Sequence, residues 1–238
     1  MDLKEATLLG DTAATHWYYK AKLAALLKLV AGRPANRVLD VGAGTGFFAR
    51  QLLLRTDCQT ATCVDPGYGD DTGETIAGKP ILFRRSAGTD AADLVLLMDV
   101  LEHVPDDVAL MAPYVAAARP GTRFVITVPA FNWLWSEHDV FLEHYRRYTL
   151  GRIEAVCAEA GLEVTTGCYF YGIVLPLAAL QRLLTRAKRA SDAPARSQMR
   201  RHSTLVNHLL WLACRMELPW FQPNRFGGLT AFVVAQKR

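Results

Sequence analysis

The sequence lacks a segment that could span a membrane. Its longest largely apolar run, Cys168 to Leu180, has 13 residues and contains Gly172 and Pro176, whereas a membrane-spanning helix needs about 20 apolar residues. The amino-terminal residues also lack the basic region and apolar core that mark an export signal. We therefore expect a cytoplasmic protein that does not cross a membrane.

Paired metal ligands are also missing from the sequence. Its five cysteines form no CxxC pair, and its histidines form no cluster at metal-binding spacing. Scattered cysteines are typical of reduced thiols in a cytosol, and this pattern predicts no metal site. Apolar residues make up 51% and charged residues 21% of the 238 positions, which indicates a globular chain of one α/β domain.

Short apolar segments alternate with helical ones along the chain. The segments typical of strands are 37–41, 60–65, 80–85, 93–99, 123–129, 162–170 and 228–238. The segments typical of helices are 20–30, 46–55, 105–118, 148–160, 173–184 and 204–217. Strands that alternate with helices predict a mostly parallel sheet with helices on both faces.

A glycine-rich turn follows the first expected strand in the sequence VLDVGAGTGFF. Gly42, Gly44 and Gly46 permit a tight turn and a close backbone approach, and Phe47 stands where a dinucleotide fingerprint needs its third glycine. Asp40 precedes this loop, where a carboxylate repels phosphate and favours a cation. The alternative for the glycines is an ordinary turn between strand and helix.

A second carboxylate makes the ligand more specific. Asp65 ends the second strand, nineteen residues after Gly46, which is the place of a carboxylate that accepts both ribose hydroxyls. A nucleoside that has no phosphate and carries an ammonium fits these features. S-adenosylmethionine is such a molecule, and we expect it as the cofactor.

The chain resembles the class I S-adenosylmethionine-dependent methyltransferases over nearly its whole length. VLDVGAGTGFF resembles their glycine motif, CVDP their ribose-binding strand end and ADLVLLMDVLEHVPDD their fourth-strand motif. The resemblance implies a Rossmann-like, seven-stranded sheet with an antiparallel last strand. It also places these residues near the cofactor: Asp40, Gly42, Gly44, Gly46, Asp65 and Asp99. The chain departs from the family at RRSAGTD, where many relatives have an acidic residue near the adenine, so backbone contacts of Ser86 or Ala87 are expected instead.

The fourth-strand motif and the amino-terminal aromatics supply further candidates. Met98 is expected to line the cofactor cleft beside Asp99, whose carboxylate can meet the methionine ammonium. His103 is either a catalytic group or a residue that fixes the turn. The sequence THWYYK contains Trp17, Tyr18 and Tyr19. Because aromatic faces attract a sulfonium or ammonium, we expect these rings, Tyr19 among them, to cover the cofactor as part of an amino-terminal helical lid, residues 1–32. The alternative is that these rings hold the first helix on the sheet.

Residues 131–149, FNWLWSEHDVFLEHYRRYT, combine aromatic, titratable and cationic side chains directly after the fifth strand. This segment is expected to face the methyl acceptor. The candidate catalytic residues are His138 as general base, Asp139 and His103. The candidate substrate-binding residues are Trp133, Trp135, Tyr145 and Arg147. Alternatively, the arginines pair with Glu137 or Glu143 and His138 caps a helix.

A helical insertion, residues 172–226, precedes the last strand within the single domain 1–238. Residues 182–201 contain seven Lys or Arg and one acid, Asp192. The insertion is interpreted either as a cap over the acceptor pocket or as a peripheral contact with anionic membranes. Nucleic-acid binding is disfavoured, because the basic residues are not interleaved with aromatics.

The motifs predict methyl transfer from S-adenosylmethionine to an O or N atom of a small or lipid-linked metabolite. One alternative is a cyclase or lyase that consumes S-adenosylmethionine on the same fold. The other is a non-catalytic partner subunit that binds S-adenosylmethionine. The sequence does not specify the acceptor or the oligomeric state.

Overall fold

The protein was analysed as a computed structural model that describes residues 14–86, 92–187 and 203–238. Part of the expected lid, Ala87 and the middle of the insertion lie outside these residues. The elements in chain order are α2 (Trp17–Val30), β1 (Arg37–Val41), α3 (Phe47–Arg55), β2 (Thr60–Val64), β3 (Thr72–Ile76), β4 (Lys79–Arg84), β5 (Leu94–Met98), η2 (Leu101–His103), α4 (Asp107–Ala117), β6 (Arg123–Pro129), η3 (Asn132–Leu134), α5 (Glu137–Phe141), α6 (Leu150–Glu159), β7 (Leu162–Phe170), α7 (Leu175–Ala187), α8 (Thr204–Glu217), η4 (Leu218–Trp220) and β8 (Thr230–Lys237).

The strands form one sheet in the order β3-β4-β2-β1-β5-β6-β8-β7. Strands β4, β2, β1, β5 and β6 are parallel, and β8 runs antiparallel to both of its neighbours. This confirms the expected Rossmann-like α/β class with an antiparallel last strand. Every residue of β5 is buried, as expected for a strand covered on both faces.

The sheet has one strand more than the seven expected. Strand β3 pairs antiparallel with β4 through the two-residue turn Ala77-Gly78, and both turn residues have positive φ. Because β3 is an exposed edge strand, it carries no alternation of buried and exposed residues from which a strand could be predicted.

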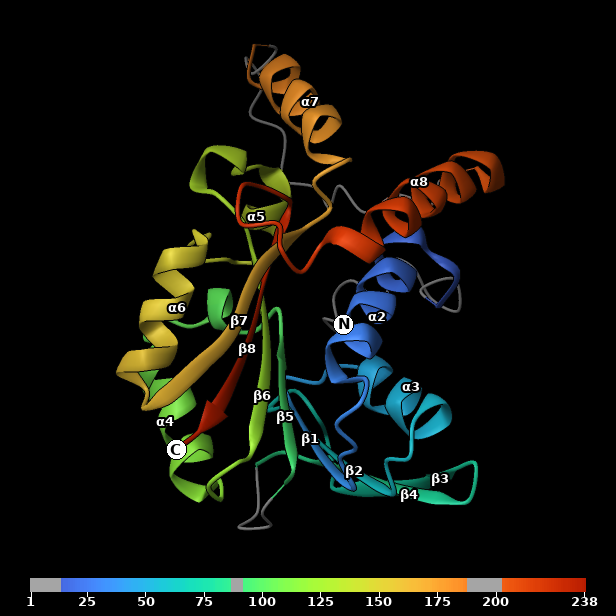
Figure 1. The fold of residues 1–238 in the computed structure, drawn as a ribbon, viewed down its shortest axis with the longest axis vertical. Coiled ribbons are helices and arrows are strands. Elements are labelled where there is room, and N and C mark those ends of the chain that lie inside the picture. The colour runs from blue at the N-terminus through green and yellow to red at the C-terminus, as the bar shows by residue number, and fades with distance from the viewer. Residues whose placement is uncertain (1–13, 87–91, 188–202) are drawn as a thin grey trace.

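Helices cover both faces of the sheet, with α2 and α3 on one face and α4 and α6 on the other (Figure 1). One core packs Leu26 of α2 and Leu52 of α3 against Leu96 of β5. The other packs Met111 of α4 and Ile153 of α6 on the opposite face. This layering is what aligns the carboxyl ends of β1, β2, β5 and β6 along one edge.

The insertion forms helices α7 and α8, which project beyond this carboxyl edge (Figure 1). Helix α8 lies against α2. There the Asn207 side chain accepts a hydrogen bond from the Trp17 amide at 2.8 Å and donates to the Thr15 carbonyl at 3.0 Å. Glu217 accepts hydrogen bonds from the amides of Gly172 and Ile173, which fixes the chain between β7 and α7. Among the described helices, none combines the length and apolar character that a membrane span requires.

Candidate active site

The glycine loop lies between β1 and α3, as expected. Gly42, Gly44 and Gly46 all have positive φ, which glycine adopts without steric cost. A Cβ on Gly42 would lie 2.7 Å from a Val100 methyl carbon, and one on Gly46 would lie 2.8 Å from the Phe83 ring. The loop therefore needs glycine both for its backbone conformation and for its packing.

Asp65 follows β2 and holds this loop. Its carboxylate accepts hydrogen bonds from the Gly44 amide at 2.9 Å and the Gly67 amide at 2.8 Å. A carboxylate has about four acceptor positions, so these two bonds leave capacity for the two hydroxyls of a ribose. The position of Asp65 after β2 is as expected, and its contact with a ribose stays a prediction. Ser86 follows β4 and is exposed.

Two polar side-chain atoms at the same loop are buried and have no hydrogen-bond partner among the described residues: Asp40 Oδ2 and Thr45 Oγ1. Burial, with the nearby charge of Asp65, raises the pKa of Asp40 to about 6. Buried polar atoms are normally paired. Two unpaired atoms beside a glycine loop therefore fit a polar, cationic ligand such as the methionine part of S-adenosylmethionine.

Asp99 follows β5 and already has a cationic partner. The ammonium of the fully buried Lys22, from α2, forms an ion pair with its carboxylate. Burial alone would lower the pKa of Lys22, but Asp99 raises it above its ordinary value. Thr127 donates to the other carboxylate oxygen at 3.0 Å. The side chain of Asp99 is still 29% exposed, so a further ligand can reach it; its contact with the methionine ammonium stays a prediction.

The amino-terminal rings pack onto the protein. Tyr18 stacks on Tyr171 with ring centroids 5.0 Å apart, and Tyr19 meets Phe47 edge to face at 5.8 Å. Trp17 lies edge-on to Tyr171. These contacts hold α2 on the sheet, which is the second interpretation that the sequence allowed for these rings. The lid itself, and the cofactor contacts of Tyr19 and of the buried Met98, stay predictions.

Residues 131–149 form a loop that is closed at its base. Ala130 and Tyr148 make a parallel bridge, and the Phe131 amide donates to the Tyr148 carbonyl at 2.8 Å. The loop is docked on η2, because the Tyr145 amide donates to the Glu102 carbonyl at 2.7 Å and Tyr148 Oη donates to the Leu101 carbonyl at 3.1 Å. It therefore lies at the carboxyl edge, where the acceptor side was predicted.

Asp139 organises the inside of this loop. Its carboxylate accepts from the amide and hydroxyl of Ser136, from Arg147 through two nitrogens, and bonds to His144 Nδ1 at 3.0 Å. Burial would raise the pKa of Asp139, but the hydrogen bonds from His144 and Arg147 hold it well below its usual range. Asp139 is an ionised carboxylate that positions other side chains.

The other predicted residues take varied positions. His138 lies in the short helix α5 and is half-buried, and Trp133 and Tyr145 are exposed. Arg147 is bound to Asp139 and the Ala130 carbonyl, so an acceptor anion would compete with a buried ion pair. The sequence alternative paired the arginines with Glu137 or Glu143. In the structure Arg147 instead forms an ion pair with Asp139, and Arg146 forms one with Asp107. Trp135 is half-buried at the end of η3.

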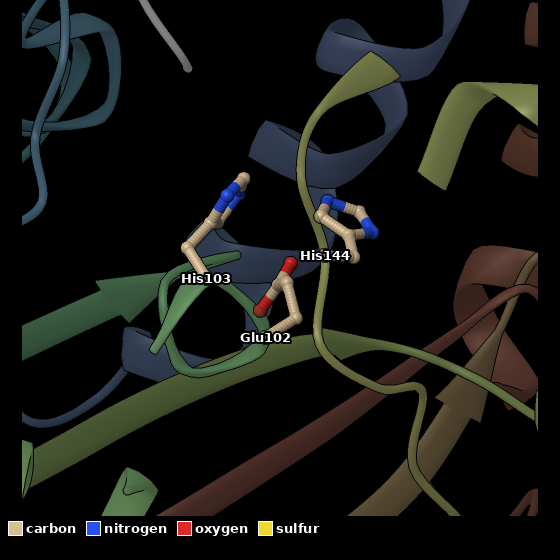
Figure 2. Close-up of side chains that lie close together, drawn as sticks. All are labelled: Glu102, His103 and His144. Carbon is tan, nitrogen blue, oxygen red and sulfur yellow. The ribbon is translucent and has the colours of Figure 1, made fainter. Parts of the chain in front are cut away.

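A cluster of titratable side chains was missed from the sequence. Glu102, His103 and His144 bring one ligand atom each to within 4.8 Å of one another (Figure 2). The rings of His103 and His144 meet edge to face with centroids 4.6 Å apart. The sequence contains Glu-His pairs at 102–103, 137–138 and 143–144, and neither their number nor their spacing indicates which of them lie close together in the fold.

Comparison with known proteins decides the family. Residues 15–166 match the model of a methyltransferase domain. The chain belongs to the class I S-adenosylmethionine-dependent methyltransferases. An uncharacterized methyltransferase from Mycobacterium ulcerans is 33% identical over 146 residues, which cover 59% of this chain and 52% of that protein. The chain thus spans about half the length of that curated relative.

Solved structures show the same fold. A putative sarcosine dimethylglycine methyltransferase from Galdieria sulphuraria has a TM-score of 0.53 at 13% identity, over 92% of this chain and 86% of that one. A phosphoethanolamine N-methyltransferase from Haemonchus contortus, bound to phosphomonomethylethanolamine and S-adenosylhomocysteine, has a TM-score of 0.51 at 18% identity, over 92% and 53%. The [4+2]-cyclase SpnF has 0.56 at 14%, over 92% and 81%. At these identities the likeness concerns the fold of the methyltransferase alone.

The Asp65→Ala variant is expected to bind S-adenosylmethionine about 10- to 150-fold more weakly, because it loses hydrogen bonds to a charged group worth about 1.5–3 kcal/mol. Isothermal titration calorimetry measures this change. Asp57→Ala is the control. It removes an exposed carboxylate that precedes β2 in the chain, at the opposite end of this strand from Asp65, and should leave the affinity unchanged. We also expect NAD to bind the parent far more weakly than S-adenosylmethionine. Unchanged affinity in Asp65→Ala would contradict the ribose assignment.

Cofactor binding is expected to weaken at acid pH. Asp40 must be ionised to attract an ammonium, and its pKa of about 6 means that it protonates as the pH falls below this value. One unit below, about tenfold less of the carboxylate is ionised. S-adenosylhomocysteine keeps the ammonium without the sulfonium, so its affinity should fall between pH 7.5 and 5. Asp40→Asn should bind weakly at both values; an unaltered pH slope in Asp40→Asn would exclude this residue.

Proposed function

We propose that this methyltransferase transfers a methyl group to an oxygen or nitrogen atom of a small metabolite, either free or linked to a lipid. When bound, S-adenosylmethionine supplies an electrophilic methyl group. The chain's own residues would hold the ribose with Asp65 and the ammonium with Asp40. Because methyl transfer at a sulfonium disperses charge, the protein mainly has to position the acceptor and exclude water.

The observation that carries this proposal is the docking of the loop 131–149 on η2. It brings titratable groups to the carboxyl edge, where Asp40, Asp65 and Asp99 are proposed to hold the cofactor. Phe131 lies between Tyr169 and Trp133, and both contacts are stacked. Stacked rings exclude water, and histidines can accept the proton of a hydroxyl or a protonated amine.

Two other functions remain to be separated by experiment. A cyclase or lyase would consume S-adenosylmethionine without an acceptor, whereas a non-catalytic subunit would bind it unchanged. Mass spectrometry of products after incubation with S-adenosylmethionine alone, and then with small-molecule and lipid extracts, distinguishes them. Methyl transfer requires a product that carries one methyl group more than its acceptor and appears only when the extract is present.

The lipid-linked form of the acceptor is favoured by the outer faces of α7 and α8. Leu177, Leu180 and Leu184 recur along α7 at a helical spacing, and each is more than half exposed. On α8 exposed apolar residues also recur at a helical spacing: Leu205, Leu209, Leu212 and Met216. The sequence between the helices is rich in Lys and Arg, which matches an anionic bilayer surface.

His138→Ala is expected to lower turnover by about 10²–10⁴-fold if His138 accepts the acceptor's proton, while the affinity for S-adenosylmethionine stays within a few-fold. Single-turnover kinetics and calorimetry measure the two effects separately. His208→Ala, which removes an exposed histidine on α8, is the matched control and should keep full turnover. Unchanged turnover in His138→Ala would give His138 a structural role.

The parent protein should sediment with phosphatidylglycerol vesicles at low salt. Binding should fall as ionic strength rises from about 0.01 to 0.15 M, because the Debye length shrinks from about 30 to 8 Å. Leu180→Glu should weaken sedimentation, whereas Leu54→Glu adds the same charge at an exposed leucine of α3 and should not. Equal sedimentation of both variants, or none by the parent, would remove the membrane contact.

Point substitutions are preferable to deletion of 172–226. Helix α8 supports α2, and the ammonium of Lys28 in α2 donates to the carbonyls of Leu218 and Pro219 at 2.9 and 2.8 Å. A deletion would therefore disturb the helix that carries Lys22. A single glutamate on the outer face of α7 leaves these contacts intact and isolates the surface.

A further inference from the structure

We propose that Glu102, His103 and His144 form a binding site for one divalent transition-metal ion beside the cofactor edge. Glu102 and His103 come from η2, directly after β5, and His144 comes from the loop that docks on η2. One ligand atom of each residue lies within 4.8 Å of the other two. Figure 2 shows a carboxylate oxygen of Glu102 pointing between the two imidazole rings.

The carboxylate of Glu102 needs a partner. The residue is 1% exposed, and neither of its oxygens has a hydrogen-bond partner among the described residues. Two cations act on it electrostatically, Lys22 and Arg147, and these form ion pairs with Asp99 and Asp139. A buried carboxylate without a partner is costly, and a cation between Glu102 and the imidazoles would supply the missing charge.

His144 is oriented as a metal ligand requires. Its Nδ1 lies 3.0 Å from Asp139 Oδ1, and a carboxylate oxygen there accepts a hydrogen bond from the ring N–H. The other ring nitrogen then carries its lone pair. A histidine that binds a metal almost always donates its second ring nitrogen to a carboxylate or carbonyl, which fixes the ring and its tautomer. Asp139 is held in turn by Ser136 and Arg147.

The donor set specifies the class of ion. Two imidazoles and one carboxylate suit Zn²⁺, Fe²⁺, Mn²⁺ or Co²⁺, whereas Mg²⁺ and Ca²⁺ prefer oxygen ligands throughout. Three protein ligands leave at least one position for another atom. On the proposed function this position faces the acceptor side, so that an acceptor oxygen or nitrogen is the expected fourth ligand. Ion binding itself does not depend on that function.

The test uses the full chain without an affinity tag. Calorimetry with Zn²⁺ and elemental analysis after dialysis should give one ion per chain, with no comparable binding of Mg²⁺. The visible spectrum of Co²⁺ should report nitrogen coordination. Glu102→Gln and His144→Ala should each lower the Zn²⁺ affinity at least about tenfold. Glu102→Gln is nearly isosteric, so it serves if His144→Ala does not fold.

His138→Ala and His208→Ala are the matched controls, because each removes a histidine outside the cluster, and both should retain the ion. Failure of the parent to bind Zn²⁺, or equal binding by Glu102→Gln, His144→Ala and the controls, would overturn the site. Zn²⁺ binding by a chain that does not bind S-adenosylmethionine would support the metal site and contradict the proposed function. A chain that binds S-adenosylmethionine but not Zn²⁺ would contradict the metal site and leave the proposed function standing.

Discussion

The ion pair between the buried Lys22 and the half-buried Asp99 is the interaction on which the arrangement of this edge depends. It joins the amino-terminal helix α2 to the residue after β5, at the centre of the sheet. Removal of Asp99 would leave the charge of the fully buried Lys22 uncompensated, which is destabilising. Asp99 also has a φ of 58°, an uncommon conformation for a residue other than glycine. The pair therefore holds α2 against the carboxyl end of β5.

Four carboxyls at this edge, three of them buried and one, Asp99, half-buried, divide into two kinds. Asp99 and Asp139 are each paired with a cation, Lys22 and Arg147, and so fix the positions of helices and loops. Asp40 and Glu102 are buried with at least one oxygen that lacks a partner in the described part of the chain. Carboxyls of the first kind are satisfied by the protein itself, and those of the second kind have capacity for a ligand. Neighbouring carboxyls can therefore serve different purposes: Asp99 and Asp139 stabilise the structure, whereas Asp40 and Glu102 are candidates for binding a ligand.

Local patterns in the sequence predicted the parallel strands, the glycine loop and Asp65, because each depends on residues close together in the chain. The exposed strand β3 was missed because it buries almost nothing. Lys22 could not be recognised as buried, since its partner is 77 residues away. His144 joins Glu102 and His103 only when the loop after β6 folds back on η2. Long-range contacts of this kind leave no recognisable spacing in the sequence, and the placement of the cofactor at the carboxyl edge stays a prediction.

Sheet topology explains why the insertion lies over the site although it is distant from the glycine loop in sequence. Phe170 at the end of β7 and Pro129 at the end of β6 both pair with Thr230 at the start of β8. The connection from β7 to β8 must therefore begin and end at the carboxyl edge of the parallel strands. Any insertion there is placed at this carboxyl edge, whatever its composition. Because α8 also packs on the helix that carries Lys22, this connection supports the site with one face while its apolar side chains remain exposed on the other.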